Sequence, residues 1–310
     1  MEKTLLIFNR FADKGKIKNS LEEILHCLMQ AGIEAEAVIT ECVGHAIDLA
    51  ETAVREGFQK VLVAGGDGTV NEAVNGLVKA QKNGYGSASL GVIPNGRGND
   101  FVYAMKIPRN LQQAVAVIQA DKRIKIDIGC AGDGATERYF CNGSGFGFDS
   151  AINYYATQSR LNGFPSYLLG LVKAILFDLH HVPAKVTWDE GTVEMPILLL
   201  TAMNGLREGG GFIVAPNFDI TDGKLDICMV GDNLKLPRLL PLIPLIMKGQ
   251  LNHPDIRTFK TRKLVVEISG PGVQSQVDGE SIFTAGTRFV SEISPWKVDL
   301  ITEYQPIGKA

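Results

Sequence analysis

One stretch, residues 61–76, constrains the fold of this chain more than any other. It reads VLVAGGDGTVNEAVNG. Residues 60–64 are mostly short, apolar and β-branched, as is typical of a buried parallel strand, whereas Val70, Val74 and Leu77 recur at helical spacing. The glycines between them permit positive φ and close approach of a ligand to the backbone. The stretch therefore predicts a strand, a tight loop and a helix whose first N–H groups point at a ligand.

The composition of this loop favours phosphate, although it matches neither of the common phosphate motifs. It lacks the Gly-Lys-Ser/Thr ending of a P-loop, and its glycines do not have the dinucleotide spacing. Asp67 would repel a phosphate unless a divalent cation lay between them, so it indicates magnesium and a nucleotide together. An ordinary strand-to-helix turn, which also favours Gly, Asp and Asn, explains the same letters equally well.

A second strand-and-loop pattern, LGVIPNGRGNDF at residues 90–101, decides between these interpretations. The succession of GGDGTVNEAVNG and P-x-G-x-GNDF resembles the diacylglycerol kinase catalytic-domain family. This family includes sphingosine and ceramide kinases and soluble bacterial lipid kinases, and NAD kinases are more distant relatives. The resemblance covers nearly the whole chain, because it continues through AP at 215–216, DGKLD at 222–226 and DGE at 278–280.

The order of patterns along the chain predicts an α/β protein of two domains. The first 124 residues read β-α-β-α-β-α, which predicts a parallel sheet whose ligands gather at the carboxyl ends of the strands. From about residue 124, short β-like runs separated by turn residues predict a mainly antiparallel domain. We expect a Rossmann-like three-layer αβα nucleotide-binding domain over residues 1–124 and a β-sandwich lipid-substrate domain over 125–294. The resemblance implies that a last strand, about 295–305, returns to the first domain.

The resemblance also implies which residues contact ATP. They lie in four polar loops: Asn9, Arg10, Asp13, Thr40, Gly65, Gly66, Asp67, Gly68, Thr69, Val70, Asn71, Glu72 and Arg97. Two of them depart from the family pattern, which usually has Thr in place of Arg97 and often Pro in place of Arg10. An arginine at position 97 could grip a nucleotide phosphate in a bidentate way, reach a lipid phosphate, or be a solvated loop residue. Nucleotide affinity and preference are therefore open.

Carboxylates are expected to carry the chemistry, because phosphoryl transfer needs Mg²⁺ on the phosphates and a base for the acceptor hydroxyl. Asp67, Asp100 and Asp127 come from different loops and could form a water-mediated magnesium network, a grouping that the resemblance also implies. By resemblance the DGE element holds the general base, with Glu280 preferred over Asp278. Both carboxylates would share one face of a strand at positions i and i+2, whereas Asp-Gly alone signals a hairpin turn.

A separate segment, DITDGK at residues 219–224, has the composition of a small metal loop with oxygen ligands. The resemblance implies a structural Mg²⁺ held by Asp219, Asp222 and the main-chain carbonyl of Lys224. Its distance in sequence from the catalytic loops suggests a supporting role for this ion.

Two apolar segments interrupt the β pattern. Residues 164–179 read as a strongly apolar helix, most of which we expect to be buried, although packing on a membrane is the alternative. Residues 234–248 carry prolines that spoil a regular helix, flanked by Lys235, Arg238 and Lys248. An apolar surface with basic flanks would serve a kinase whose substrate lies in a bilayer.

Composition and charge narrow the function classes further. The balance of 31 basic and 34 acidic residues argues against nucleic-acid binding. The 5 cysteines are scattered and lack a C-x-x-C pair, as expected for free thiols in a reducing cytoplasm. No uninterrupted apolar run is long enough to span a membrane. We expect a cytoplasmic protein that associates peripherally with the inner face of the membrane, and the sequence leaves a homodimer open.

Together these features predict a lipid kinase that uses ATP and Mg²⁺, with diacylglycerol as the leading acceptor. Phosphatidylglycerol, a sphingoid base and ceramide are alternative acceptors. A kinase for a soluble acceptor, resembling NAD kinases, is the alternative enzyme. A nucleotide-sensing or membrane-binding protein without activity is the alternative from another class.

Overall fold

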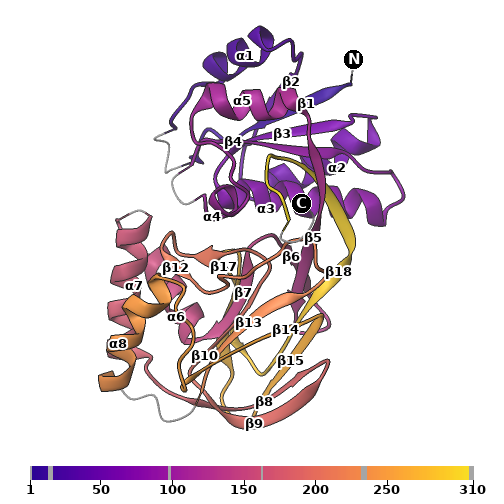
Figure 1. Ribbon diagram of the computed structural model, residues 1–310. Coiled ribbons are helices and arrows are strands. Elements are labelled where there is room, and N and C mark those ends of the chain that lie inside the picture. The colour runs from indigo at the N-terminus through magenta and orange to yellow at the C-terminus, as the bar shows by residue number, and fades with distance from the viewer. Residues whose placement is uncertain (1, 13–16, 97–98, 162, 232–235, 307–310) are drawn as a thin grey trace. The chain divides into compact units, whose positions relative to one another are not determined.

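The computed structural model describes residues 2–12, 17–96, 99–161, 163–231 and 236–306 (Figure 1). The chain divides into two compact units. The first consists of Met1–Ile128 and Pro295–Ala310, and the second consists of Gly129–Ser294. The chain passes between the units within two long strands, β5 (Arg123–Gly132) and β18 (Arg288–Ile301).

The first unit is built on a parallel sheet with strand order β2-β1-β3-β4-β18. The first four strands are β1 (Thr4–Phe8), β2 (Glu36–Ile39), β3 (Lys60–Gly65) and β4 (Ser89–Pro94). The carboxyl-terminal part of β18 is the fifth, where Leu300 pairs with Leu90. All residues of β1, β3 and β4 are buried, as expected for strands covered on both faces.

Helices form the two outer layers of this unit. They are α1 (Leu21–Gln30), α2 (His45–Arg55), α3 (Asp67–Lys82), the short α4 (Asp100–Ala104) and α5 (Leu111–Ala120). Helices α1 and α5 share one apolar cluster with Leu6 and Phe8 of β1, whereas α2 and α3 pack against each other and against β1 and β3. Because Leu5 and Ile7 on the opposite face are buried too, the sheet lies between two helical layers.

The second unit contains two antiparallel sheets. One has strand order β14-β13-β10-β7-β16-β17. Its strands are β7 (Gly143–Gly147), β10 (Leu199–Met203), β13 (Leu225–Val230), β14 (Ile256–Thr261), β16 (Val273–Val277) and β17 (Glu280–Gly286). In the other sheet, β15 (Lys263–Ile268) lies between the first part of β18 and β8 (Val182–Trp188), which pairs with β9 (Gly191–Ile197). The short strands are β6 (Glu137–Phe140), β11 (Arg207–Glu208) and β12 (Phe212–Ile213).

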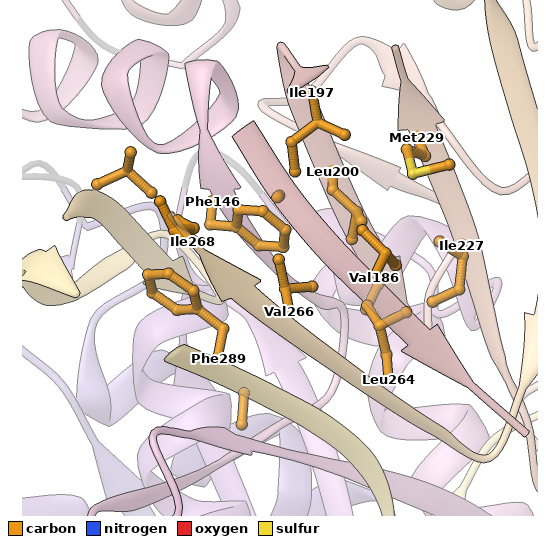
Figure 2. Packing of buried hydrophobic residues seen from close by; sticks show 14 of the residues in the cluster. Phe146, Val186, Ile197, Leu200, Ile227, Met229, Leu264, Val266, Ile268 and Phe289 are labelled. Atoms are coloured by element: carbon orange, nitrogen blue, oxygen red, sulfur yellow. The ribbon is translucent and has the colours of Figure 1, made fainter. Parts of the chain in front are cut away.

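Side chains from both sheets meet in one apolar core (Figure 2). Phe146 of β7 stacks on Phe289 of β18, with ring centroids 5.1 Å apart and an interplanar angle of 5°. Leu200 of β10 and Val186 of β8 belong to the same cluster and are fully buried. The predicted fold class, an αβα domain with a parallel sheet followed by a mainly antiparallel sandwich, is confirmed.

The helices in the described part of the second unit are α6 (Phe148–Thr157), α7 (Phe164–Phe177) and α8 (Leu236–Met247). Helix α6 packs on α7 and on β7 and β16. The expectation that most of the apolar segment 164–179 is buried was wrong, because only Ser166, Gly170, Leu171 and Ala174 of α7 are buried. Four of its other apolar side chains are exposed: Leu168, Val172, Leu176 and Phe177.

Helix α8 also differs from expectation, because it continues through Pro241 and Pro244. Each proline removes one backbone hydrogen bond, which leaves the carbonyls of Pro237 and Leu240 without their helical donors. Both prolines and these two residues are exposed, so water can solvate those carbonyls. In the described part of the chain no helix is both long and apolar enough to cross a membrane.

Candidate active site

The glycine loop after β3 is shaped to receive an anion. Strand β3 ends at Gly65, Gly66 precedes α3 with extended backbone angles, and no side chain caps the amino-terminal end of this helix. A helix start that lacks a capping side chain presents backbone N–H groups and the positive end of the helix dipole. The first turn contains Gly68 and Thr69, as the sequence predicts for a phosphate loop.

The loop after β4 lies directly against this glycine loop. The Asn95 N–H donates to the Gly65 carbonyl over 2.9 Å. A Cβ added to Gly96 would lie 2.6 Å from the Cα of Gly66, closer than Cβ atoms and backbone carbons approach in proteins. Position 96 therefore has to be glycine, because the two loop backbones lie too close together for a Cβ atom between them.

The end of β1 is tied to the first turn of α3. The Asn9 side-chain amide donates to the Thr69 hydroxyl over 2.9 Å, and its carbonyl accepts the N–H of Phe11. Thr40, at the end of β2, is buried and donates its N–H to the Phe8 carbonyl. Three of the predicted nucleotide loops thus meet at one sheet edge. Arg10 lies over the ring of Phe11, and the predicted contacts Asp13 and Arg97 lie outside the described residues.

Two acidic residues, Asp67 and Glu72, cap other helices of the first unit. The Asp67 carboxylate accepts the N–H groups of Asp100 and Phe101 over 2.8 and 3.2 Å, so it caps α4. Glu72, predicted to contact ATP, caps α2 in the same way by accepting the N–H groups of Gly44 and Ala46. Val70 and Asn71 are buried in α3, the helix that also carries Glu72.

The three carboxylates of the predicted magnesium network have different surroundings. The Asp67 carboxylate accepts the backbone N–H of Asp100, whereas the buried Asp127 forms an ion pair with Lys297 over 2.6 Å. Among the residues that the structure describes, no group of three or more acidic, His or Cys side chains could hold a metal directly. No local pattern in the sequence indicates Lys297, which lies far from Asp127 along the chain.

In the second unit, Asp278 and Gly279 form the two-residue turn of the β16–β17 hairpin. Their φ angles are 46° and 84°, as in the turn type that Asp-Gly favours. The expectation that Asp278 and Glu280 share one face of a strand was therefore wrong, and the hairpin alternative was right. The Asp278 carboxylate turns back and accepts the N–H groups of Cys141, Asn142 and Gly143 over 2.8, 2.9 and 2.9 Å.

Other side chains fix the rest of this turn. The Gly279 N–H donates to the Gln276 side-chain carbonyl over 2.8 Å, and the Gly279 carbonyl accepts from Asn153 over 2.7 Å. Glu280 begins β17 and forms an ion pair with Arg138, with 37% of the Glu280 side chain exposed. Sequence reasoning missed Gln276, Asn153 and Arg138, because only the tertiary fold brings them to the turn.

Gln276 also joins the turn to a buried pair of acids. Its side-chain amide donates to Asp149 over 2.9 Å and to Glu208 over 3.1 Å, and the Tyr167 hydroxyl donates to Asp149. Burial raises the pKa of Asp149, and its hydrogen bonds, including one to Glu208, oppose this rise. Gln276 thus links the turn to two buried acidic side chains.

Asp149 and Glu208 are among the residues that line a mostly apolar cavity of about 60 Å³. Its walls come from α6, α7, α8 and strands β10 and β13. They include Phe148, Leu171, Thr201, Phe212 and Leu242. The hydroxyl of the fully buried Thr201 has no hydrogen-bond partner among the described residues. The cavity thus combines apolar walls with a few polar groups.

The predicted metal loop lies at the start of β13. Asp219 accepts both the N–H and the hydroxyl of Thr221, over 2.9 and 2.8 Å. Asp222 accepts the Lys224 N–H with one oxygen and contacts the Lys260 ammonium with the other, over 2.9 and 2.7 Å. Lys260 is a partner that the sequence did not indicate.

Comparison with known proteins matches both units. Residues 3–131 match the model of the diacylglycerol kinase catalytic domain, and residues 144–302 match that of the YegS C-terminal NAD kinase beta sandwich-like domain. The chain is 30% identical to a diacylglycerol kinase of Bacillus subtilis over 286 residues, which is 90% of each protein.

Solved structures agree in fold. A diacylglycerol kinase from Bacillus anthracis superimposes with a TM-score of 0.72 at 23% identity, covering 97% of both chains. An NAD kinase from Archaeoglobus fulgidus, solved in complex with ATP, gives a TM-score of 0.52 at 11% identity over 96% of this chain and 93% of that one.

Proposed function

Because the chain belongs to the diacylglycerol kinase family, a family of phosphotransferases, we propose that it transfers the γ-phosphoryl group of ATP to a lipid hydroxyl. Diacylglycerol is the proposed acceptor and phosphatidic acid the product. The observation that carries this choice is the apolar cavity under α7 and α8 in the second unit. A soluble acceptor such as NAD carries charged phosphates, which are costly to bury in a cavity without charged partners for them.

The nucleotide is assigned to the first unit. The start of α3 would receive the phosphates, and the contact between Gly66 and Gly96 keeps side chains away from them. A magnesium ion, when bound through water to Asp67 and Asp100, would neutralise charge on the phosphates. Asn9 and Thr40 line the same edge of the sheet and support the placement of the nucleotide there.

Glu280 is the general base in this proposal, and Asp278 is a positioning residue. The Asp278 carboxylate already accepts three backbone N–H groups, so its oxygens are engaged in holding the turn. Glu280 is partly exposed, and its side-chain partner is Arg138. Since Gln276 and Asn153 fix the backbone of Gly279, the position of Glu280 is set before substrate binds.

The hydrocarbon part of the acceptor is assigned to the cavity. A volume of about 60 Å³ is smaller than an acyl chain, so α7 or α8 must move outward when a lipid binds. Helix α8 is suited to such a movement because Pro241 and Pro244 remove two of its backbone hydrogen bonds. The Thr201 hydroxyl and the acid pair would then face the polar part of the lipid.

An exposed apolar patch on the same helices would face the membrane. The α7–α8 patch consists of Leu168, Val172, Leu176, Phe177, Leu236 and Leu240. Leu176 and Phe177 are 68% and 71% exposed, which is unusual for side chains of this size, and residues of both helices line the same cavity. Arg238 and Lys248 lie near the patch in sequence and suit an anionic surface.

We expect the double substitution Leu176→Ser with Phe177→Ser to weaken binding to anionic lipid vesicles by about tenfold or more, because each apolar side chain contributes about 1.5 to 3 kcal/mol when buried. Vesicle co-sedimentation measures the change. Activity on a short-chain, water-soluble diacylglycerol should stay unchanged. Met29→Ser removes an equally exposed apolar side chain from α1 and is the control. Equal loss of vesicle binding in both proteins would contradict the assignment of the patch.

The proposed function is tested by transfer of labelled γ-phosphate from ATP and Mg²⁺ to a panel of acceptors. The panel contains diacylglycerol, ceramide, a sphingoid base and phosphatidylglycerol in mixed micelles, together with soluble NAD. We expect labelled phosphatidic acid as the main product. Label in another lipid would support the proposed reaction and change the proposed acceptor. Label in NAD would overturn the assignment of a lipid acceptor. Binding of ATP without transfer to any acceptor would favour a nucleotide-sensing protein.

A further inference from the structure

We propose that the side-chain ammonium of Lys260 takes the place of a structural divalent cation in the loop that precedes β13. The Lys260 Nζ lies 2.7 Å from Oδ2 of Asp222, 3.3 Å from Oδ2 of Asp226 and 3.2 Å from the main-chain oxygen of Asn217. Two carboxylates and a carbonyl oxygen around one positive charge form the type of environment that a hard metal ion occupies. In this protein the Lys260 ammonium occupies that environment.

The predicted magnesium ligands are engaged by other groups. Asp219 accepts two hydrogen bonds from Thr221, and the second oxygen of Asp222 accepts the Lys224 N–H. A metal ion held by Asp222 would be repelled by the ammonium against the same carboxylate, and the oxygen left for it already accepts the Lys224 N–H. No cluster of three or more acidic, His or Cys side chains that suits a metal was found in the part of the chain that the structure describes.

The geometry of the sheet gives Lys260 a fixed place. Lys260 on β14 is directly opposite Asp226 on β13 in the antiparallel register, so the two side chains are cross-strand neighbours. From there the ammonium reaches Asp222, whose side chain is 26% exposed. The lysine thereby ties the loop before β13 to the neighbouring strand β14, which is the supporting role expected of the metal.

Thermal unfolding without nucleotide tests this proposal, because no substrate-bound magnesium then contributes. We expect the wild-type protein to have the same melting temperature in EDTA and in millimolar MgCl₂ and to retain no divalent metal after dialysis. Lys260→Met should lower the melting temperature in EDTA by about 2 to 4 °C, as for a loss of roughly 1 kcal/mol, and Mg²⁺ should restore it. Lys260→Arg, which keeps the charge, should remain insensitive to metal.

Lys263→Met is the matched control, because Lys263 of β15 forms an ion pair with Glu292 of β18 and is 52% exposed. Its melting temperature should not respond to Mg²⁺. A bound divalent ion in the dialysed wild-type protein, or a lower wild-type melting temperature in EDTA, would overturn the proposal. So would a Lys260→Met protein that is as stable as wild type or indifferent to Mg²⁺. If Lys260→Met does not fold, the wild-type metal content and its EDTA response decide alone, and neither depends on kinase activity.

Discussion

Replacing Glu280 with glutamine is expected to lower kcat for lipid phosphorylation by roughly 10²- to 10⁴-fold, the usual contribution of a general base. Glutamine keeps the size of the side chain but cannot accept the proton of the acceptor hydroxyl. The affinity for ATP should remain the same, because the proposed nucleotide contacts lie in the first unit. Steady-state kinetics with diacylglycerol and calorimetric titration with ATP measure the two quantities.

Glu190→Gln provides the control for this experiment. Glu190 lies in the turn between β8 and β9, so it is another exposed carboxylate beside a hairpin turn of the same unit. This variant should keep wild-type kcat. Full activity of Glu280→Gln, or an equal loss of turnover and ATP affinity, would remove Glu280 from the role of base.

Introducing a single methyl group at Gly96 is expected to weaken ATP binding by roughly tenfold or more, equivalent to at least about 1.4 kcal/mol. The new Cβ of Gly96→Ala would lie 2.6 Å from the Cα of Gly66 and 3.0 Å from its nitrogen. Both contacts are to backbone atoms, so no rotamer change can relieve them. One of the two loops has to move, and the start of α3 moves away from the position that receives phosphate.

The affinity for ATP is measured by calorimetric titration, and the melting temperature shows whether the first unit remains folded. Ser87→Ala is the control, because Ser87 is exposed just before β4, the same strand that leads to Gly96. Unchanged ATP affinity in a folded Gly96→Ala protein would contradict the assignment of these loops to the nucleotide.

Local patterns were sufficient to predict the fold class but not every element. The strands at residues 4–8 and 60–65 and helix α3 follow directly from apolar runs and helical spacing. Helix α6 was missed, because the region after residue 124 was expected to be mainly antiparallel β structure. The last strand was expected at about 295–305, whereas β18 begins at Arg288. Pro295 is exposed within this strand, where a missing N–H is tolerated.

Only the parts of the candidate site that contiguous sequence motifs encode could be predicted. The glycine loops and the DGE turn could be found because their letters lie together in the sequence. The partners that define their roles could not, since Arg138 and Glu280, Lys297 and Asp127, and Lys260 and Asp222 form pairs across long stretches of chain. The roles assigned to the nucleotide and catalytic residues remain predictions that the substitutions above test.

The placement of β18 in the first unit has a consequence for synthesis on the ribosome. Strand β4 pairs with β18 through Leu90 and Leu300, which are 210 residues apart in the chain. At a synthesis rate of 5 to 20 residues per second, β18 is translated roughly 10 to 40 s after β4. During that time the nascent sheet has an open strand edge of the kind that pairs with other chains. The edge of β4 is therefore covered only by a strand that is translated 210 residues later.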